Sequence, residues 1–197
     1  MLRTARIAVL VSGGGTNLQA LIDAQKSQIL KSGRLELVIS NKENAYALKR
    51  AENNDIQALY IKKDADFEKN LITALEENNI DLIVLAGFLV ILSEDFVKKY
   101  DRRIINIHPS LIPAFCGDGF YGLKVHEAAL KRGVKLTGAT THFVNEITDG
   151  GEIIMQKPVE IKENDTPEIL QRRVMEEAEW KILPLSVEKV SKDIISE

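Results

Sequence analysis

An asparagine and a histidine stand two positions apart where an apolar segment ends. Residues 103–107 (RIINI) predict a strand, and Asn106 and His108 alternate along it with isoleucines, so their side chains should share one face. A histidine can hold or donate a proton near neutral pH, and an asparagine amide can donate to a developing oxyanion. The spacing therefore indicates proton transfer at a strand end, where open parallel sheets bind ligands. The alternative is a strand-terminal histidine bonded to nearby backbone.

An aspartate begins the turn Asp149-Gly150-Gly151, in which the glycines are expected to supply the positive φ. Close to His108, this aspartate would raise the pKa of the imidazole by favouring its charged form, and it could guide a proton through water. Asp-Gly pairs are also common in ordinary turns. The residues alone do not place Asp149 near His108.

A glycine-rich loop, SGGGTN at residues 12–17, joins an expected strand to an expected helix. Free backbone N–H groups and the helix dipole at such a junction favour an anion. No GK[ST] follows, so the loop is not a P-loop, and Leu18 occupies the last glycine position of a GxGxxG fingerprint. A single phosphate group fits better than a dinucleotide. The alternative is a tight turn that binds nothing.

Other candidate residues carry less weight. Cys116 follows His108 in a loop, but no base is placed beside it by spacing, so a nucleophilic role is disfavoured. His142 lies on an expected strand and could face the site or simply pack. His126 lies on an expected helix. The three histidines match no metal-ligand spacing such as HExxH, so no metal site is predicted.

The order of the elements predicts an α/β protein with an open, Rossmann-like, mostly parallel sheet, helices on both faces and an antiparallel C-terminal portion. Thr166 is expected to cap the last helix, and Pro184 is expected to kink or divide it. The expected strands are residues 6–11, 35–39, 57–61, 81–86, 103–107, 135–145 and 152–161, and the expected helices are 17–30, 45–54, 66–78, 123–132 and 166–191.

Composition narrows the possible partners and locations. The chain has 197 residues, which at roughly 150 residues per domain indicates one domain. Its net charge of -3 gives no basic excess for nucleic acid, so small-molecule partners are expected. The longest apolar stretch, residues 82–92, is shorter than the roughly 20 residues of a membrane helix. A cytoplasmic location is expected, with a monomer or homodimer both open.

Five segments in this order and spacing resemble the folate-dependent formyltransferases, and the first loop is similar to their glycinamide ribonucleotide branch. The Asn-x-His-Pro-Ser-Leu run followed by Asp-Gly-Gly is the most specific part. The resemblance covers about residues 5–190. The segments are SGGGTNLQALIDA, ISNKENAYALKRA, DLIVLAGFLVILS, RIINIHPSLIPAF and THFVNEITDGGEIIMQKPV.

The resemblance implies the formyltransferase fold and a reaction. The amine of 5-phosphoribosylglycinamide would attack the formyl carbon of 10-formyltetrahydrofolate, the co-substrate, and release tetrahydrofolate. His108, held cationic by Asp149, would stabilise the oxyanion and protonate the leaving nitrogen. Asn106 would donate to the same oxygen, and Asp149 would help remove a proton from the amine. No metal is implied.

The resemblance also implies binding residues. The sequence departs from the family's pattern at Val90, where arginine is frequent, and at Trp180, where histidine is typical. Residues 62–66 are shorter than the matching family segment, which leaves Lys63 as the nearest basic contact. The implied ribonucleotide residues are Gly15, Thr16, Asn17 and Glu179, and the implied folate residues are Lys63, Leu89, Val90, Ile91, Leu92 and Asn106.

The resemblance implies one formyltransferase domain over residues 1–197. Its first half, to about residue 100, would bind the ribonucleotide phosphate, and its second half would bind folate and carry the catalysis. Three other functions are alternatives. A methionyl-tRNA formyltransferase and a formyltetrahydrofolate hydrolase would each be expected to carry a further domain. A non-catalytic nucleotide-binding module would not need Asn106, His108 and Asp149 together.

Overall fold

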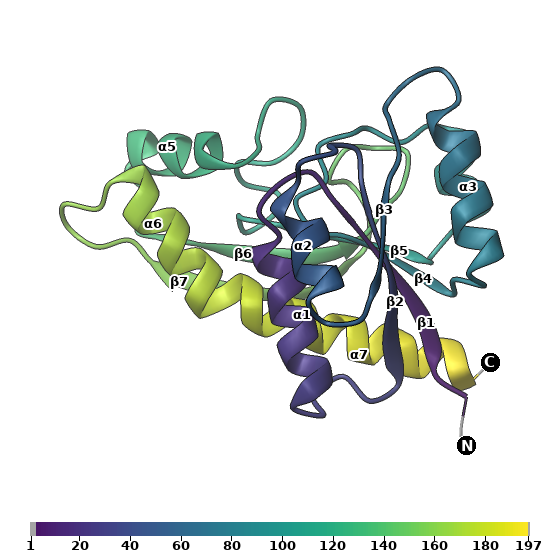
Figure 1. The fold of residues 1–197 in the computed structure, drawn as a ribbon. Helices are drawn as coiled ribbons and strands as arrows, with labels where there is room; N and C mark the ends of the chain where they lie inside the picture. Colours follow the sequence, from purple (N-terminus) through teal and green to yellow (C-terminus); the bar gives the residue numbers. More distant parts are fainter. Residues whose placement is uncertain (1–2, 197) are drawn as a thin grey trace.

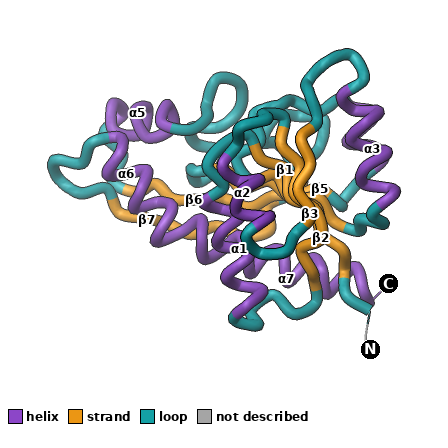
Figure 2. Tube along the Cα trace, viewed as in Figure 1, coloured by secondary structure: helices purple, strands orange, loops and turns teal. Residues whose placement is uncertain are grey.

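The computed structural model describes residues 3–196, so residues 1, 2 and 197 of the predicted domain lie outside the described part. Seven strands form one sheet in the order β3-β2-β1-β4-β5-β6-β7 (Figures 1 and 2). The strands β1 to β5 pair in parallel, whereas β6 is antiparallel to both of its neighbours. The predicted fold class is therefore confirmed. The strands are β1 (Ala5–Val11), β2 (Gly33–Ser40), β3 (Gln57–Tyr60), β4 (Leu82–Leu85), β5 (Ile104–His108), β6 (Leu136–Phe143) and β7 (Ile153–Glu160).

Helices cover both faces of the sheet, because its central strands are apolar on both sides. In β1, Ile7 and Val9 belong to one buried cluster, and Ala8 and Leu10 belong to the other. The first cluster also contains side chains of α1, α2, α6 and α7, and the second contains those of α3 and α4. The helices are α1 (Thr16–Lys26), α2 (Tyr46–Glu52), α3 (Phe67–Glu77), α4 (Glu94–Lys99), α5 (Leu123–Arg132), α6 (Pro167–Val174) and α7 (Trp180–Ser196), with a π-helical turn η1 (Met175–Glu179).

One predicted helix extends too far, and one helix was not predicted. The expected helix 17–30 ends at Lys26, because Gln28 adopts a φ of 60° and the amides of Ile29 and Leu30 both donate to the carbonyl of Ala24. Ile29, expected on the helix, is exposed. The short helix α4 was not predicted, although Ser93 caps it by accepting a hydrogen bond from the amide of Phe96 at 3.2 Å.

The C-terminal helix changes its winding before Pro184 rather than at it. The π-helical turn η1 separates α6 from α7, and Pro184 lies inside α7, which continues to Ser196. The carbonyl that a proline at 184 cannot bond is that of Trp180, the first residue after the π-turn. The disturbance expected from Pro184 therefore falls at this junction. Thr166 caps α6 as predicted.

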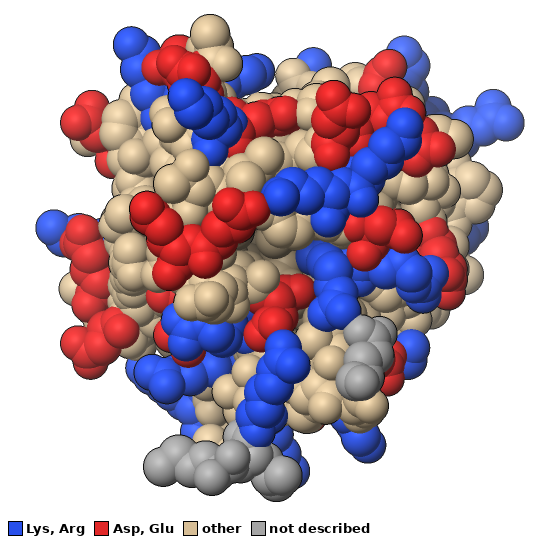
Figure 3. All heavy atoms as spheres, turned by 90° about the vertical axis from the view of Figure 1, so that its right-hand side faces the viewer, with Lys and Arg blue, Asp and Glu red and all other residues tan. Residues whose placement is uncertain are grey.

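Charged side chains of both signs alternate over the face that carries α3 and α4 (Figure 3). Lys99 pairs with Glu76 at 2.9 Å, and Lys98 pairs with Glu94 at 2.6 Å. Within residues 3–196, no helix is both long and apolar enough to cross a membrane.

Candidate active site

A cleft of about 540 Å³ opens beyond the carboxyl ends of β4 and β5. We call it the central cleft. Four stretches of chain line it, and they come from both halves of the sequence: residues 87–92, the end of β5, the loop 117–122 and the turn 144–149. Asn106, His108 and Asp149 all belong to its lining. The structure thus brings together the three residues that were expected to carry the chemistry.

The antiparallel pairing of β5 with β6 adds a residue to this group. Asn106 stands opposite His142, and His108 stands opposite Thr140. The side-chain nitrogen Nδ2 of Asn106 lies 3.1 Å from Nε2 of His142. Nδ1 of the same histidine lies 2.8 Å from the carbonyl oxygen of Phe143. His142 is buried, so it lines the cleft floor rather than packing elsewhere.

Asp149 lies between the two histidines. Its Oδ2 is 3.5 Å from Nδ1 of His108, and its Oδ1 is 3.5 Å from Nε2 of His142. The amide of Gly117 donates to Oδ2 at 2.9 Å. Burial raises the pKa of Asp149, but the contacts with His142, His108 and the Gly117 amide outweigh it, so this pKa is lowered overall. The side chain is therefore a carboxylate near neutral pH.

The turn that carries Asp149 was predicted with the wrong residue in the left-handed region. Asp149 itself has a φ of 55°, whereas Gly150 and Gly151 do not adopt positive φ. The glycines are required for space: a Cβ at Gly151 would lie 1.8 Å from the carbonyl oxygen of Phe143, and one at Gly150 would lie 2.6 Å from Ile147. The chain therefore folds back tightly enough to direct Asp149 into the cleft.

His108 is buried between two acceptors. Its Nε2 lies 2.9 Å from the carbonyl oxygen of Phe115, and its Nδ1 faces Asp149. Because a carbonyl oxygen only accepts, Nε2 carries a proton in this arrangement. Burial lowers the pKa of His108, and this outweighs the opposing effects of Asp149 and of the Phe115 carbonyl. The expectation that Asp149 holds His108 cationic is therefore wrong, because desolvation of the ring exceeds the attraction.

Residues 89–92 line the central cleft as expected, but their side chains differ in orientation. Val90 is buried, whereas Leu89 and Ile91 are exposed to 57% and 79%. The amide of Leu89 already donates to the hydroxyl of Ser12 at 2.9 Å. The Leu89 amide is therefore committed within the protein, and a ligand would have to use other backbone groups of residues 89–92. Lys63 is exposed after β3 and is not among the residues that line the cleft.

Three of the four residues expected to bind the ribonucleotide lie at the start of α1, and the fourth, Glu179, lies in η1. Gly15 has a φ of 71°, and a Cβ there would lie 2.6 Å from that of Ala47, so only glycine fits. The side-chain amide Nδ2 of Asn17 donates to Oε2 of Glu179 at 2.6 Å, and this bond joins α1 to the π-helical turn η1. Burial raises the pKa of Glu179 to about 7, although the hydrogen bond from Asn17 lowers it. Oδ1 of Asn17 is buried and has no partner among the described residues.

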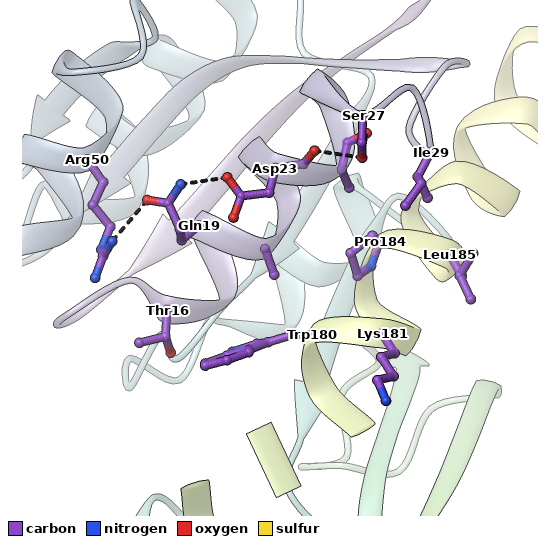
Figure 4. A pocket seen from close by; sticks show the side chains of 12 residues that line it. Thr16, Gln19, Asp23, Ser27, Ile29, Arg50, Trp180, Lys181, Pro184 and Leu185 are labelled. Atoms are coloured by element: carbon purple, nitrogen blue, oxygen red, sulfur yellow. Dashed lines mark hydrogen bonds between the residues drawn. The ribbon is translucent and has the colours of Figure 1, made fainter. Parts of the chain in front are cut away.

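A second groove, of about 530 Å³, runs between α1 and α7 beside this pair (Figure 4). Thr16 and Trp180 lie at the same end of it, next in sequence to Asn17 and Glu179. Gln19 connects Arg50 to Asp23 by hydrogen bonds of 2.9 Å each along its rim. Thr16 therefore lines this groove rather than the central cleft.

Comparison with known proteins identifies the family of the chain. The family model described as "Formyl transferase" matches residues 5–187. The chain belongs to the formyl transferase family. The resemblance predicted from its motifs is thereby confirmed, since the match includes the glycine-rich loop, the strand end at His108 and the turn at Asp149.

The relatives of this formyl transferase include proteins named for glycinamide ribonucleotide formyl transfer and for purine biosynthesis. A phosphoribosylglycinamide formyltransferase of Haemophilus influenzae is 40% identical over 92% of the chain and 85% of that protein. The human trifunctional purine biosynthetic protein adenosine-3 is 43% identical over 96% of the chain, which spans only 18% of that protein. The solved structure of glycinamide ribonucleotide transformylase 1 from Symbiobacterium toebii has a TM-score of 0.89 at 37% identity, over 96% of this chain and 89% of that one.

Two contributors to the site were missed from the sequence. His142 was left undecided because its orientation depends on the register of β6 against β5. The Phe115 carbonyl was missed because backbone groups carry no sequence signal. A period-two alternation from Thr140 to His142, read with an antiparallel partner, would have indicated that His142 points toward the cleft.

Proposed function

We propose that this formyl transferase moves the formyl group of 10-formyltetrahydrofolate to the amine of 5-phosphoribosylglycinamide. The products are formylglycinamide ribonucleotide and tetrahydrofolate, as in purine biosynthesis. The observation that carries the proposal is the convergence of Asn106, His108 and Asp149 in one cleft, in a chain that also holds a buried Asn17–Glu179 pair at the start of α1. Each group has a task in transfer between two small molecules.

The central cleft suits the folate co-substrate. A flat heterocycle needs apolar walls edged by backbone donors and acceptors, and the irregular stretch 89–92 supplies both. Val90 fills the wall with its side chain, so the pterin would pair with backbone of residues 90–92. Lys63 is not among the lining residues, so the proposal assigns it no contact with the folate.

The start of α1 suits the ribonucleotide. The phosphate would lie at the backbone amides of Gly15 and Thr16, where the helix dipole favours negative charge. Asn17 has a buried Oδ1 that finds no partner in residues 3–196, and an acceptor of this kind fits a ribose hydroxyl. Glu179, held by Asn17, would accept from the ribose or from the glycinamide portion.

Proton handling falls to His108 and Asp149. His108 donates a hydrogen bond from Nε2 to the Phe115 carbonyl. An oxygen or nitrogen atom of the substrate would replace that carbonyl as the acceptor. Asn106 would donate to the oxygen that becomes negative when the amine adds to the formyl carbon. Asp149, an anion 3.5 Å from His108, would stabilise the imidazolium and accept the amine proton through a water molecule. The proton removed from the amine would pass from Asp149 to Nδ1 of His108, and the resulting imidazolium would give its Nε2 proton to the leaving nitrogen when the carbon–nitrogen bond to the folate breaks.

A formyltetrahydrofolate hydrolase is the alternative within the same chemistry, with water in place of the amine. The Asn17–Glu179 pair favours the transferase, because a hydrolase needs no second organic substrate. The experiment is to follow tetrahydrofolate release with purified protein, with and without 5-phosphoribosylglycinamide. Release that requires the amine supports the proposal. Equal release without it would establish the hydrolase, and no release would indicate a binding module.

A further inference from the structure

An irregular segment forms one wall of the central cleft. Residues 87–92 lie between β4 and α4, and they have no helical or strand structure of their own. Two hydrogen bonds fasten the start of this segment, and Ser12 makes both. The Ser12 amide donates to the carbonyl of Gly87 at 3.0 Å, and the Ser12 hydroxyl accepts from the amide of Leu89 at 2.9 Å.

The Ser12 hydroxyl is fixed in direction. It donates to Oδ1 of Asn41, just after β2, at 2.7 Å. A hydroxyl has one proton to donate, and this proton is committed to Asn41, so a lone pair is left for Leu89. Ser12 is 4% exposed, and water has little access to replace either bond.

Ser12 is also the first residue of the glycine-rich loop. Gly13 and Gly14 line a separate hollow of about 490 Å³ together with residues 42–46. The carbonyl of Gly13 accepts from the amide of Ala47 at 3.1 Å, and that of Gly14 accepts from Nε of Arg50 at 2.8 Å. The loop is therefore anchored to α2 on one side, and through Ser12 to the wall of the central cleft on the other.

We propose that Ser12 is a positioning residue for the folate co-substrate, because its hydroxyl and amide hold residues 87–92 at the edge of the central cleft. The proposal rests on the proposed function. Ser12 is the first residue of a loop that is expected to bind the phosphate of the ribonucleotide. The proposal gives it a role in binding the folate instead. Ser12 touches no reacting atom, and it acts through the backbone of Gly87 and Leu89.

The physical consequence concerns binding rather than chemistry. Replacing Ser12 with alanine removes the acceptor of the Leu89 amide, and it leaves the Gly87 bond and the side-chain volume nearly intact. The segment gains freedom that it must lose when the co-substrate binds, so affinity falls. His108, Asn106 and Asp149 are attached to β5 and to the 144–151 turn, so their geometry is retained.

The experiment compares Ser12→Ala with Ser191→Ala. Ser191 is a matched control: its hydroxyl is fully buried on α7 and has no partner within the described residues. Hydrogen exchange of the Leu89 amide is measured by NMR, and kcat and the KM values are measured by formyl transfer. In Ser12→Ala, exchange at Leu89 should accelerate by at least about tenfold, since the loss of one backbone hydrogen bond opens this site locally.

In the same variant, KM for 10-formyltetrahydrofolate should rise by about tenfold, the effect of one lost hydrogen bond on a partly buried group, while kcat stays within about threefold. Ser191→Ala should change neither quantity. Unchanged protection of Leu89, or an unchanged folate KM, in Ser12→Ala overturns the proposal. Should the unsubstituted protein transfer no formyl group, the proposed function fails, and exchange at Leu89 still decides whether Ser12 holds the segment.

Discussion

The carboxylate of Asp149 lies 3.5 Å from Nδ1 of His108, on the side of the ring opposite to the Phe115 carbonyl at Nε2. Two acceptors therefore flank one imidazole. Such an arrangement favours the charged ring, whereas its burial favours the neutral one, and burial has the larger effect on the pKa. Asp149 is thus placed to stabilise the positive charge that His108 carries when its ring takes up a second proton.

Removing the imidazole should abolish most of the turnover. His108→Ala deletes the group that we propose donates to the oxyanion and to the leaving nitrogen, so kcat should fall by about 10²–10⁴-fold, as for other general acids. The folded state should be retained, since Asp149 keeps the hydrogen bond from the Gly117 amide and its contact with His142. Steady-state kinetics and near-UV circular dichroism check both points. Activity within threefold of the parent protein would refute the assigned role.

Cys116 provides the matched control in the same loop region. Its pKa is raised by burial and by Asp149, so the thiolate needed for nucleophilic attack is disfavoured. Cys116→Ser should therefore keep kcat within about twofold, since no covalent intermediate is required. A loss comparable with that of His108→Ala would revive the thiol nucleophile.

Replacing Asp149 by asparagine should change the pH dependence as well as the rate. The carboxylate raises the pKa of His108 against the effect of burial. Asp149→Asn removes the charge that raises this pKa, so the pKa of His108 should fall further. The decline of kcat/KM that accompanies deprotonation of the imidazole should therefore occur at lower pH. The rate should drop by about 10²–10³-fold, the typical loss of a preorganised electrostatic partner. Rate profiles between pH 5 and pH 9 test this, and a decline at unchanged pH would contradict it.

The sheet and most of the helices could be predicted because each buried strand is a short apolar run between turn residues. The helix α5 at 123–132 matched its prediction, since glycines stand directly on either side of it. The six-residue helix α4 was missed because so short a segment has little periodicity, and only the Ser93 cap marks it. Asn106 and His108 were found because alternation along one strand is local information.

The remaining site geometry depends on contacts between distant segments. His142 reaches the cleft through the β5–β6 register, and the Asn17–Glu179 hydrogen bond joins the first helix to the π-helical turn near the C-terminus. The pKa of His108 was mispredicted for the same reason. Proximity to a carboxylate could be anticipated from the family, but the desolvation that outweighs it is a property of the whole packed core.

His126 should make the protein sensitive to acid. It is fully buried on α5, and neither ring nitrogen has a partner among the residues described. Burial, assisted by His108, lowers its pKa from 6.5 to about 4. Between these two pH values the unfolded chain binds a proton that the folded chain excludes, so stability falls as pH drops from 6.5 towards 4. The cost for this one group is roughly 3 kcal/mol.

His126→Leu should remove this part of the acid sensitivity, because leucine has no proton to bind and no polar atom to leave unpaired. Urea unfolding at pH 7 and pH 5 measures the free energy at each. Between pH 7 and pH 5 the change in stability should be more favourable in the variant than in the parent by the His126 contribution, because His108 and Glu179 titrate in both proteins with opposite effects. Equal changes in both proteins would show that His126 is not the titrating group.

Glu179 should have the opposite effect on stability, at a cost to function when it is replaced. Its pKa rises from 4.5 to about 7 through burial, so the folded chain retains a proton that the unfolded chain releases in that range. The corresponding stability is fully present below pH 4.5 and is lost as pH rises through 7. In Glu179→Gln, the amide oxygen can still accept from Asn17, and no charge is buried at any pH. The variant should therefore be more stable than the parent at pH 8, by up to about 3 kcal/mol.

The same substitution should weaken ribonucleotide binding, because the proposed contact is made by the carboxylate. KM for 5-phosphoribosylglycinamide should rise by about tenfold or more, as expected when a charged hydrogen-bond acceptor is replaced by a neutral one, and KM for the folate should stay unchanged. Urea unfolding at pH 8 and separate titration of each substrate measure the two effects. A gain in stability without a change in ribonucleotide KM would mean that Glu179 only connects η1 to α1. A rise in the folate KM instead would place the pair in the other substrate's site.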